Sequence, residues 1–329
     1  MISCTRVQWK ACIAMTVSAA LALLATALPA HAQAYPSRSI TILVGYSAGG
    51  QADALARTIG KQLGETYKIS VVIENKTGAN GMIAAQAAAR AEPDGYTILL
   101  VTDAMLTIDP HLASSNRFDL ASAMEPVVNV AWSPMLLAAA NNVPANSVAE
   151  LVAVGKSQQL SFGSPGSATP HRLAGEMLQK AGGFTMTNIP YKGTSGSVND
   201  LLGGQIPLLF GAPTLLEPLA TAGKIKLLGV TSGQRYPLLP TVPAIGETFP
   251  GFKIISYIGF MLPKKTPAEV IAALNKEVNA ILATDAMRAW LDKQGMIAVG
   301  GTKDDFIRQV ESDYKSRGEL VRALGITGE

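Results

Sequence analysis

The sequence predicts an α/β fold of two units, each built on a mainly parallel sheet flanked by helices. Short apolar runs alternate with segments of helical periodicity, which favours parallel strands joined by helical crossovers. The same pattern starts again near residue 147. The chain has 329 residues, of which 48% are hydrophobic and 16% charged, enough for two cores of ordinary domain size.

The N-terminal segment has the pattern of a secretory signal. Arg6 and Lys10 precede an uncharged run over residues 11–30, and a small-x-small cleavage site, "AHA", follows at residues 30–32, with "AQA" at residues 32–34 as a second choice. This pattern predicts a signal peptide over residues 1–32. An uncleaved membrane anchor is the alternative, but the run is rich in alanine and short for a membrane span.

Removal of that segment changes the composition. Both cysteines, Cys4 and Cys12, are lost, so a disulfide framework is not expected. The mature chain keeps 25 of the 27 Lys and Arg residues against all 24 Asp and Glu residues, and the basic residues are scattered. Scattered charge argues against nucleic acid as a partner. We expect a soluble, nearly neutral protein of a bacterial-type periplasm.

In the first unit, five-residue apolar runs alternate with two helical segments. Strands are expected at residues 40–44, 69–73 and 97–101 because the runs suit strands buried on both faces. An alanine-rich helix is expected over residues 82–91. The first helix is predicted by the spacing of Ala52, Leu55, Ile59 and Leu63.

The second unit begins with a helix start signal, in which Ser147 and Glu150 form a capping-box pattern. Strands are expected at residues 160–162, 206–210 and 225–230. Near the C-terminus, Thr266 and Thr302 are expected to cap two further helices, with Pro267 at the first position of one of them. The predicted buried stripes of these helices are Val270, Leu274, Val278 and Ile281, and Phe306, Val310 and Tyr314.

Signals of catalytic chemistry are few. The sequence has no Gly-x-Ser-x-Gly elbow, no Walker loop and no pair of histidines at metal-binding spacing. Its three histidines are His31 in the signal segment and His111 and His171 in expected loops. We therefore expect no enzyme activity, no catalytic residues, no metal site and no cofactor.

Two strand-to-helix junctions carry the strongest functional signal. In "YSAGGQAD" the strand ends near Gly45 and a helix begins near Gln51, so Gly49 and Gly50 let the backbone approach a ligand at the helix N-terminus. Free amides and the helix dipole favour an anion such as a carboxylate there. A plain tight turn is the alternative. "SPGSATPH", residues 164–171, repeats the arrangement, and two such loops suit a cleft that holds a small anion from both sides.

From Tyr35 to the C-terminus the sequence resembles the extracytoplasmic solute receptors of tripartite tricarboxylate transporters, the Bug receptors. The similarity rests on "YPSRSITILVGYSAGGQADALAR", "VVIENKTGANGMIAAQAAARAEPDGYTILL", "IPYKGTSGSVNDLLGGQIPLLF" and "GKIKLLGVTSGQRYPLLPTVPAIGE". It implies a two-lobed periplasmic binding protein (Venus flytrap) fold. The implied division is signal peptide 1–32, lobe 1 over residues 33–135 and 257–329, and lobe 2 over residues 136–256.

The resemblance also implies a function, a site and partners. Such a receptor closes on a small organic acid and delivers it to the permease subunits of a membrane transporter, and we expect it to act as a monomer. Asp53 is interpreted as a residue that favours the helix dipole. By position, the implied ligand-binding residues are Tyr46, Ser47, Ala48, Gly49, Gly50 and Gln51 in the first loop, and Ser164, Gly166, Ser167 and Thr169 in the second.

Two charged residues depart from the family pattern and are added to the candidate site. Asp103 follows the strand "YTILLVT" and is expected at the carboxyl edge of the sheet, where α/β folds bind ligands. An unpaired carboxylate would repel a bound one. Either a donor on the ligand or a cation such as Arg172 must compensate, which favours a ligand with one carboxylate and a neutral or donor-bearing far end. Alternatively, Asp103 caps the next segment and points away.

Other function classes remain open at this stage. A periplasmic sensing subunit that presents its ligand to a membrane sensor kinase would use the same fold and the same cleft. Kinase capture that depends on ligand would favour this class, and ligand turnover would favour an enzyme.

The signal-peptide pattern yields a first prediction. The exported protein is expected to begin at Gln33, because signal peptidase cleaves after the small-x-small motif. N-terminal sequencing of the exported form tests this, and an intact Met1 would contradict it.

Overall fold

The computed structural model describes residues 35–112, 118–165, 169–191 and 194–325. The predicted signal peptide therefore lies outside the described residues. Residues 38–329 form one compact unit, separate from residues 1–37.

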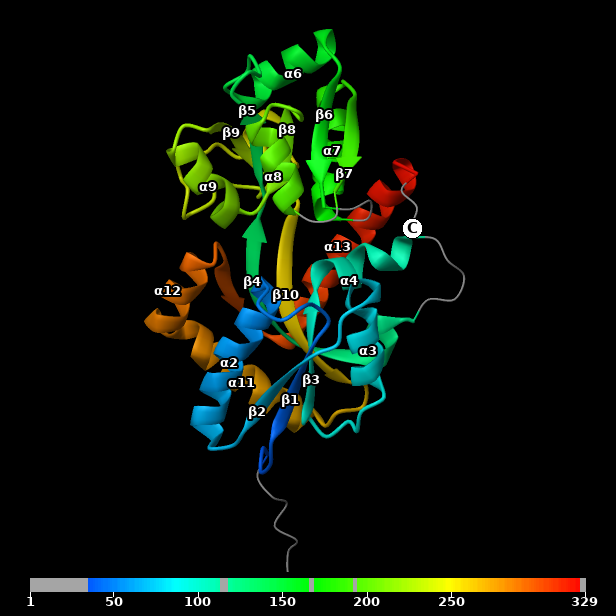
Figure 1. Cartoon of the computed structure of the whole chain (residues 1–329). Helices are drawn as coiled ribbons and strands as arrows, with labels where there is room; N and C mark the ends of the chain where they lie inside the picture. Colours follow the sequence, from blue (N-terminus) through cyan, green and yellow to red (C-terminus); the bar gives the residue numbers. More distant parts are fainter. Residues whose placement is uncertain (1–34, 113–117, 166–168, 192–193, 326–329) are drawn as a thin grey trace, which may run out of the picture. The chain divides into compact units, whose positions relative to one another are not determined.

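The first sheet has six strands in the order β11-β4-β10-β3-β1-β2 (Figure 1). Strands β1 to β4 run in one direction, and β10 and β11 run in the other. The strands are β1 (Ile40–Val44), β2 (Val71–Asn75), β3 (Thr97–Thr102), β4 (Met124–Pro134), β10 (Ile255–Pro263) and β11 (Ile297–Gly300). Its helices are α2 (Gln51–Tyr67), η1 (Ala79–Gly81), α3 (Met82–Ala89), α4 (Asp103–Thr107), η2 (Asp109–His111), α5 (Leu120–Ala123), α11 (Ala268–Ala283), α12 (Asp285–Lys293) and α13 (Lys303–Ala323).

The second sheet has five strands in the order β7-β6-β8-β5-β9, and only β5 runs against the other four among the strands described. The expected two sheets flanked by helices are therefore confirmed, but the first sheet is mixed: β10 pairs antiparallel with β3 and β4, and β11 with β4. The strands are β5 (Leu136–Ala140), β6 (Leu160–Ser164), β7 (Met186–Pro190), β8 (Leu208–Gly211) and β9 (Ile225–Val230). The helices are α6 (Val148–Ser157), α7 (Pro170–Gly182), α8 (Thr194–Leu202), α9 (Pro213–Thr221) and α10 (Ile245–Thr248).

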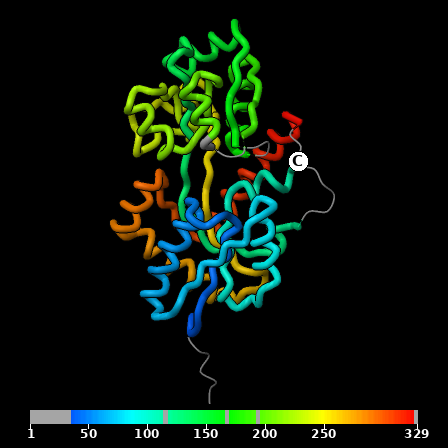
Figure 2. The backbone as a smooth tube through the Cα atoms, in the orientation of Figure 1, coloured from blue at the N-terminus to red at the C-terminus, as the bar shows by residue number. Residues whose placement is uncertain are grey.

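The chain passes between the two sheets twice. Met135 alone separates β4 from β5, and the return runs over residues 231–254 to β10. The two crossings are hydrogen-bonded to each other: the Met135 amide donates to Thr231 Oγ1 at 2.9 Å, and the Thr231 amide donates to the Met135 carbonyl at 2.9 Å. In Figure 2, the paired strands β4 and β10, which adjoin these crossings, run side by side. We call the region made of β4, Met135, residues 231–254 and β10 the hinge.

Side chains of the first sheet alternate between its two faces, as the period of a strand requires. Leu43, Leu99 and Val101 belong to one buried cluster with the alanines of α3. On α2, a side chain at Gly60 would lie 3.1 Å from Ile73 and 3.6 Å from Ile42. Glycine at this position therefore lets α2 lie close against the sheet.

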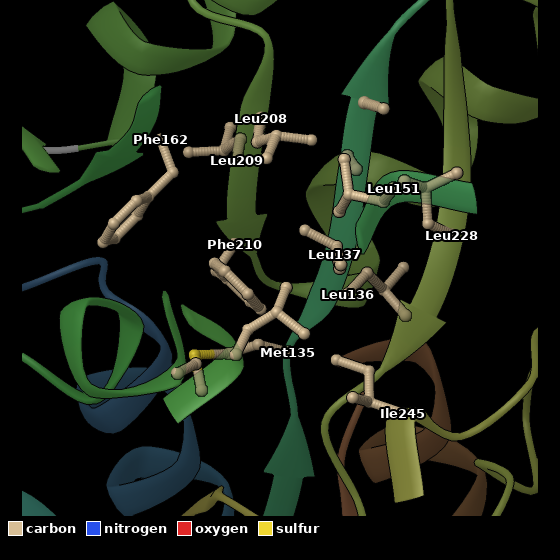
Figure 3. Packing of buried hydrophobic residues seen from close by; sticks show 14 of the residues in the cluster. Met135, Leu136, Leu137, Leu151, Phe162, Leu208, Leu209, Phe210, Leu228 and Ile245 are labelled. Carbon is tan, nitrogen blue, oxygen red and sulfur yellow. The ribbon is translucent and has the colours of Figure 1, made fainter. Parts of the chain in front are cut away.

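The core of the second sheet is built from aromatic and leucine side chains (Figure 3). Phe162 of β6 and Phe210 of β8 meet edge to face, with ring centroids 6.2 Å apart, a favourable arrangement for aromatic pairs. Ala104 and Ile108 near α4, and Val321 of α13, belong to the same buried cluster. Helical segments attached to the first sheet therefore pack into the core of the second.

Several predicted elements shift by a few residues. The expected strand at residues 40–44 is β1 itself, but those at 69–73 and 206–210 begin two residues later, as β2 and β8. The predicted cap at Ser147 is confirmed, because its hydroxyl accepts from the Glu150 amide at 3.2 Å. Thr302 and Asp305 likewise form a reciprocal capping box.

Two local predictions near the C-terminus are wrong. Thr266 does not cap a helix: its hydroxyl donates to the Pro263 carbonyl, and α11 begins at Ala268. Tyr314 is 43% exposed and stacks on His111, with ring centroids 4.2 Å apart. The buried stripe of α13 continues instead through Arg317 and Val321. At about 3.6 residues per turn, Arg317 returns to the face of Phe306, whereas Tyr314 does not.

Candidate functional site

The loop after β1 is exposed and leads directly into a long helix. Residues 47–51 are all exposed, and α2 begins at Gln51 with no capping side chain among the described residues. These amides and the positive end of the dipole form a place for an anion. Gly49 has φ +83° and needs the freedom of glycine, whereas Gly50 has φ −76° and does not.

Asp53, in the first turn of α2, fixes this loop through hydrogen bonds. Its carboxylate accepts from the Gly49 amide, from Arg57 Nε and from Asn75 Nδ2, each at 2.9 Å. Hydrogen bonding from Arg57, with smaller contributions from Gly49 and Asn75, lowers the pKa of Asp53 to about 2. Both carboxylate oxygens thus serve to shape the loop, in agreement with the structural interpretation of this residue.

Asn75, at the end of β2, was not identified by the sequence analysis. Its Nδ2 donates to the Tyr46 carbonyl at 3.0 Å as well as to Asp53, so it joins both sides of the loop. The only sequence signal was an amide residue directly after the strand "VVIE". Nothing local indicates that such a residue faces a neighbouring loop.

The segment after β2 has an unusual backbone. Residues 78–81 all have positive φ, including Ala79 at +46° and Asn80 at +54°. Asn80 is held by both oxygens of Asp109, at 2.9 and 2.7 Å. A side chain at Gly45 would lie 2.4 Å from the Gly81 backbone, so the loops after β1 and β2 meet there. Such conformations persist where the surroundings hold them and are frequent at functional sites.

Tyr46 links the loop after β1 to the end of β3. Its hydroxyl lies 2.8 Å from Thr102 Oγ1 at the end of β3. Burial raises the pKa of Tyr46 to about 12, so the phenol stays neutral at physiological pH. The structure thus brings Tyr46 next to the segment that carries Asp103.

Asp103 is the first residue of α4 and is only 3% exposed. Its partner is Arg317 of α13, which also donates to Thr107 Oγ1 at 3.0 Å and to the Ile255 carbonyl at 2.6 Å. The other carboxylate oxygen accepts from the Tyr257 amide at 3.4 Å. Burial raises the pKa of Asp103, and the Arg317 guanidinium opposes that rise.

This pairing corrects the expected compensation at Asp103. The cation beside it is Arg317, not Arg172, because α13 folds back against α4 and brings the guanidinium to the carboxylate. The carboxylate is not unpaired, so it gives no reason for the ligand to carry a donor or to lack further carboxylates.

The loop of the second sheet is described in part. Ser164 ends β6 and is fully buried, while Gly166 and Ser167 lie outside the described residues. Thr169 caps α7, since its hydroxyl accepts from the Arg172 amide at 3.4 Å. The Arg172 side chain lies 3.6 Å from the Glu176 carboxylate on the same helix.

His171 lies in the first turn of α7 and is neutral near pH 7, because burial lowers its pKa to about 4.

The candidate residues form two groups, one at the carboxyl edge of each sheet, where α/β folds bind ligands. The first group also reaches α12, because Gln51 Nε2 donates to the Gln294 carbonyl at 2.9 Å. Amides and hydroxyls at such edges bind and orient a small anion.

In the described part of the chain, no group of three or more His, Cys, Asp or Glu side chains is arranged to hold a metal ion. Within the same ranges, no helix combines the length and the apolar character that a membrane crossing requires.

The tripartite tricarboxylate transporter receptor family model matches residues 53–326. The chain belongs to this family. A UPF0065 protein of Bordetella bronchiseptica is 35% identical over 315 residues, which cover 95% of this chain and 94% of that protein. BugT of Bordetella pertussis is 29% identical over 91% of this chain and 93% of its own length.

Solved structures agree with this assignment. An R. palustris protein solved with adipate is 32% identical, with a TM-score of 0.77, and the match covers 89% of this chain and 99% of that one. The periplasmic binding protein BugD is also 32% identical, with a TM-score of 0.72, and covers 90% of this chain and 100% of its own. The protein is a two-lobed solute-binding receptor of this family and not an enzyme.

The two loop glycines are expected to differ in their tolerance of a side chain. Gly49→Ala places an L-residue at positive φ and should lower the free energy of unfolding by about 1 kcal/mol. Gly50→Ala is the matched control and should cost less, because its φ suits any residue and the added Cβ meets only the Ser47 carbonyl, at 3.3 Å. Urea unfolding measures both, and a larger loss in Gly50→Ala would contradict the loop geometry.

Arg317→Met is expected to destabilise the protein by about 3–5 kcal/mol, because it leaves the Asp103 carboxylate buried without its cation. Arg308→Met, on the same helix, removes an exposed pair with Asp305 and should change stability little. Thermal and urea unfolding compare the two variants. Equal stability would show that the buried pair does not have this structural role.

Proposed function

We propose that this receptor captures a small carboxylate in the periplasm, between its two lobes, and delivers it to the membrane subunits of a tripartite transporter. The observation that carries the proposal is the start of α2. Its first backbone amides have no capping side chain among the described residues and directly follow the exposed glycine loop. The related R. palustris protein solved with adipate supports a carboxylate as the ligand.

We assign residues 33–135 and 257–329 to the first lobe and residues 136–256 to the second, with residues 1–32 as the export signal. The membership of the two sheets supports this division, since β4 is followed by β5 at Met135 and β10 returns to the first sheet. The family, which is one of transporter receptors, supports export and the transporter partner.

In this proposal the first loop and the second loop hold the ligand from opposite sides. The amides at the start of α2 donate to one carboxylate oxygen pair, and the loop keeps its shape without the ligand because Asp53 and Asn75 already hold it. A preformed loop lowers the entropy cost of binding. The proposed contacts are Tyr46, Ser47, Ala48, Gly49, Gly50, Gln51, Ser164, Gly166, Ser167, Thr169 and Arg172.

Asp103 has a different role in this proposal. It fixes the carboxyl edge of β3 through Arg317 and contributes no free charge toward the ligand. Tricarboxylates are therefore as admissible as smaller acids on electrostatic grounds at this position.

Calorimetry with adipate, succinate and citrate tests the proposed site. Gly50→Val should weaken binding of whichever acid binds the wild type at least tenfold, because the added methyl groups stand over the first amides of α2. Folding should be retained, since φ at Gly50 is −76°. Ala272→Val, at an exposed position of α11, is the control. Unchanged affinity in a folded Gly50→Val protein would contradict the site.

A further inference from the structure

A second pocket lies on the hinge, away from the two loops described above. Its volume is about 710 Å³, a size typical of small-molecule sites. It is lined by β4, β10, β11 and α13 and by the segment that returns from β9 to β10. None of the residues that line it belongs to the loops after β1 or β6. A molecule bound here would touch β4, the start of β10 and the segment that returns to β10.

The pocket is lined by a residue that carries a buried acceptor without a partner. Asn129 of β4 is 6% exposed, and its Oδ1 atom is shielded from solvent with no hydrogen bond among the described residues. A buried polar atom without a partner is costly, because it gives up its hydrogen bond to water. Rotation of the Asn129 amide toward the pocket would let a hydroxyl or amino group of a ligand donate to this atom and remove that cost.

The charged residues that line the pocket are both cations, Arg235 and Lys253. Arg235 is already engaged: it donates to both oxygens of Glu247, at 2.8 and 2.9 Å, and to the Pro240 carbonyl. Lys253 is exposed, its stem lies along Gly233, and no ion pair holds it within the described chain. The ammonium group of Lys253 is therefore available to an anion.

Apolar surface completes the pocket. Trp132 is partly buried and meets Tyr236 edge-on, with ring centroids 5.9 Å apart. Val299 of β11, at the edge of the sheet, is 45% exposed. A hydrocarbon chain between two polar ends fits against these side chains.

From this arrangement we propose a second ligand site at the hinge, for a small carboxylate that also carries a hydroxyl or amino donor. The carboxylate pairs with Lys253, and the donor binds Asn129 Oδ1.

Three acids that differ at one carbon test the proposal: malate, aspartate and succinate. The exported protein carries Trp290→Phe, so that Trp132 is the only tryptophan left after removal of Trp9, and Gly50→Val, which disables the proposed main site. Malate and aspartate should change the Trp132 fluorescence saturably, and succinate should bind at least tenfold more weakly because it leaves Asn129 unpaired. Equal affinities for the three acids would overturn the proposal.

Variants at the pocket then assign the contacts. In the same background, Lys253→Met should weaken binding at least tenfold, while Lys276→Met, an exposed lysine of α11, should not change it. Asn129→Ala should abolish the difference between malate and succinate without lowering stability, since it removes an unpaired polar group. A Lys253→Met protein that binds malate normally would overturn the hinge site.

The background substitution keeps the two sites distinguishable. Fluorescence changes in the Trp290→Phe protein that vanish with Gly50→Val would report the main site alone, and would overturn the hinge site while leaving the proposed function intact. Changes that survive Gly50→Val but require Lys253 support the hinge site. If calorimetry shows that Gly50→Val does not change the affinity for the acid that binds the wild type, this result counts against the main site only.

Discussion

The ion pair between Asp103 and Arg317 is the interaction on which the ligand edge of the first sheet depends. One guanidinium binds Asp103 and Thr107, at the two ends of α4, and the carbonyl of Ile255, the first residue of β10. Two charges removed from water are stable only in close, fully hydrogen-bonded geometry. The pair therefore fixes how α13 packs against α4 and β10. This packing in turn positions α4 next to the loops that follow β1 and β2.

The candidate ligand loop is shaped by a second polar network next to this pair. Tyr46 meets Thr102, which precedes Asp103, while Asp53 and Asn75 hold the glycine turn from the other side. The left-handed segment after β2 closes against Gly45. Together these contacts leave the first amides of α2 as the unsatisfied groups of a rigid edge, which is a suitable arrangement for capturing an anion.

The hinge combines rigid and adaptable features. The backbone hydrogen bonds between Met135 and Thr231 join the two crossings, and Val321 of α13 packs into the core of the second sheet. Next to these crossings, however, Asn129 is buried beside an open pocket, and its Oδ1 has no hydrogen-bond partner in the described part of the chain. Such a group is tolerated where most of a structure is well satisfied, and it marks the place where a further molecule would contribute most.

The sequence by itself determined the local elements and the nature of the loop. Strand β1, the buried stripe of α2 and the cap at Ser147 follow from contacts between residues two to four apart, which periodicity and capping patterns report directly. The Gly-Gly turn before a helix likewise indicated an anion site, and the family motifs indicated two lobes. Only the tertiary structure decided the partner of Asp103, because Arg317 lies 214 residues further along the chain. It also decided that Asn75 joins the loop and that Asn129 is left unpaired at the hinge, since both depend on which strands and helices pack together and not on their neighbours in sequence.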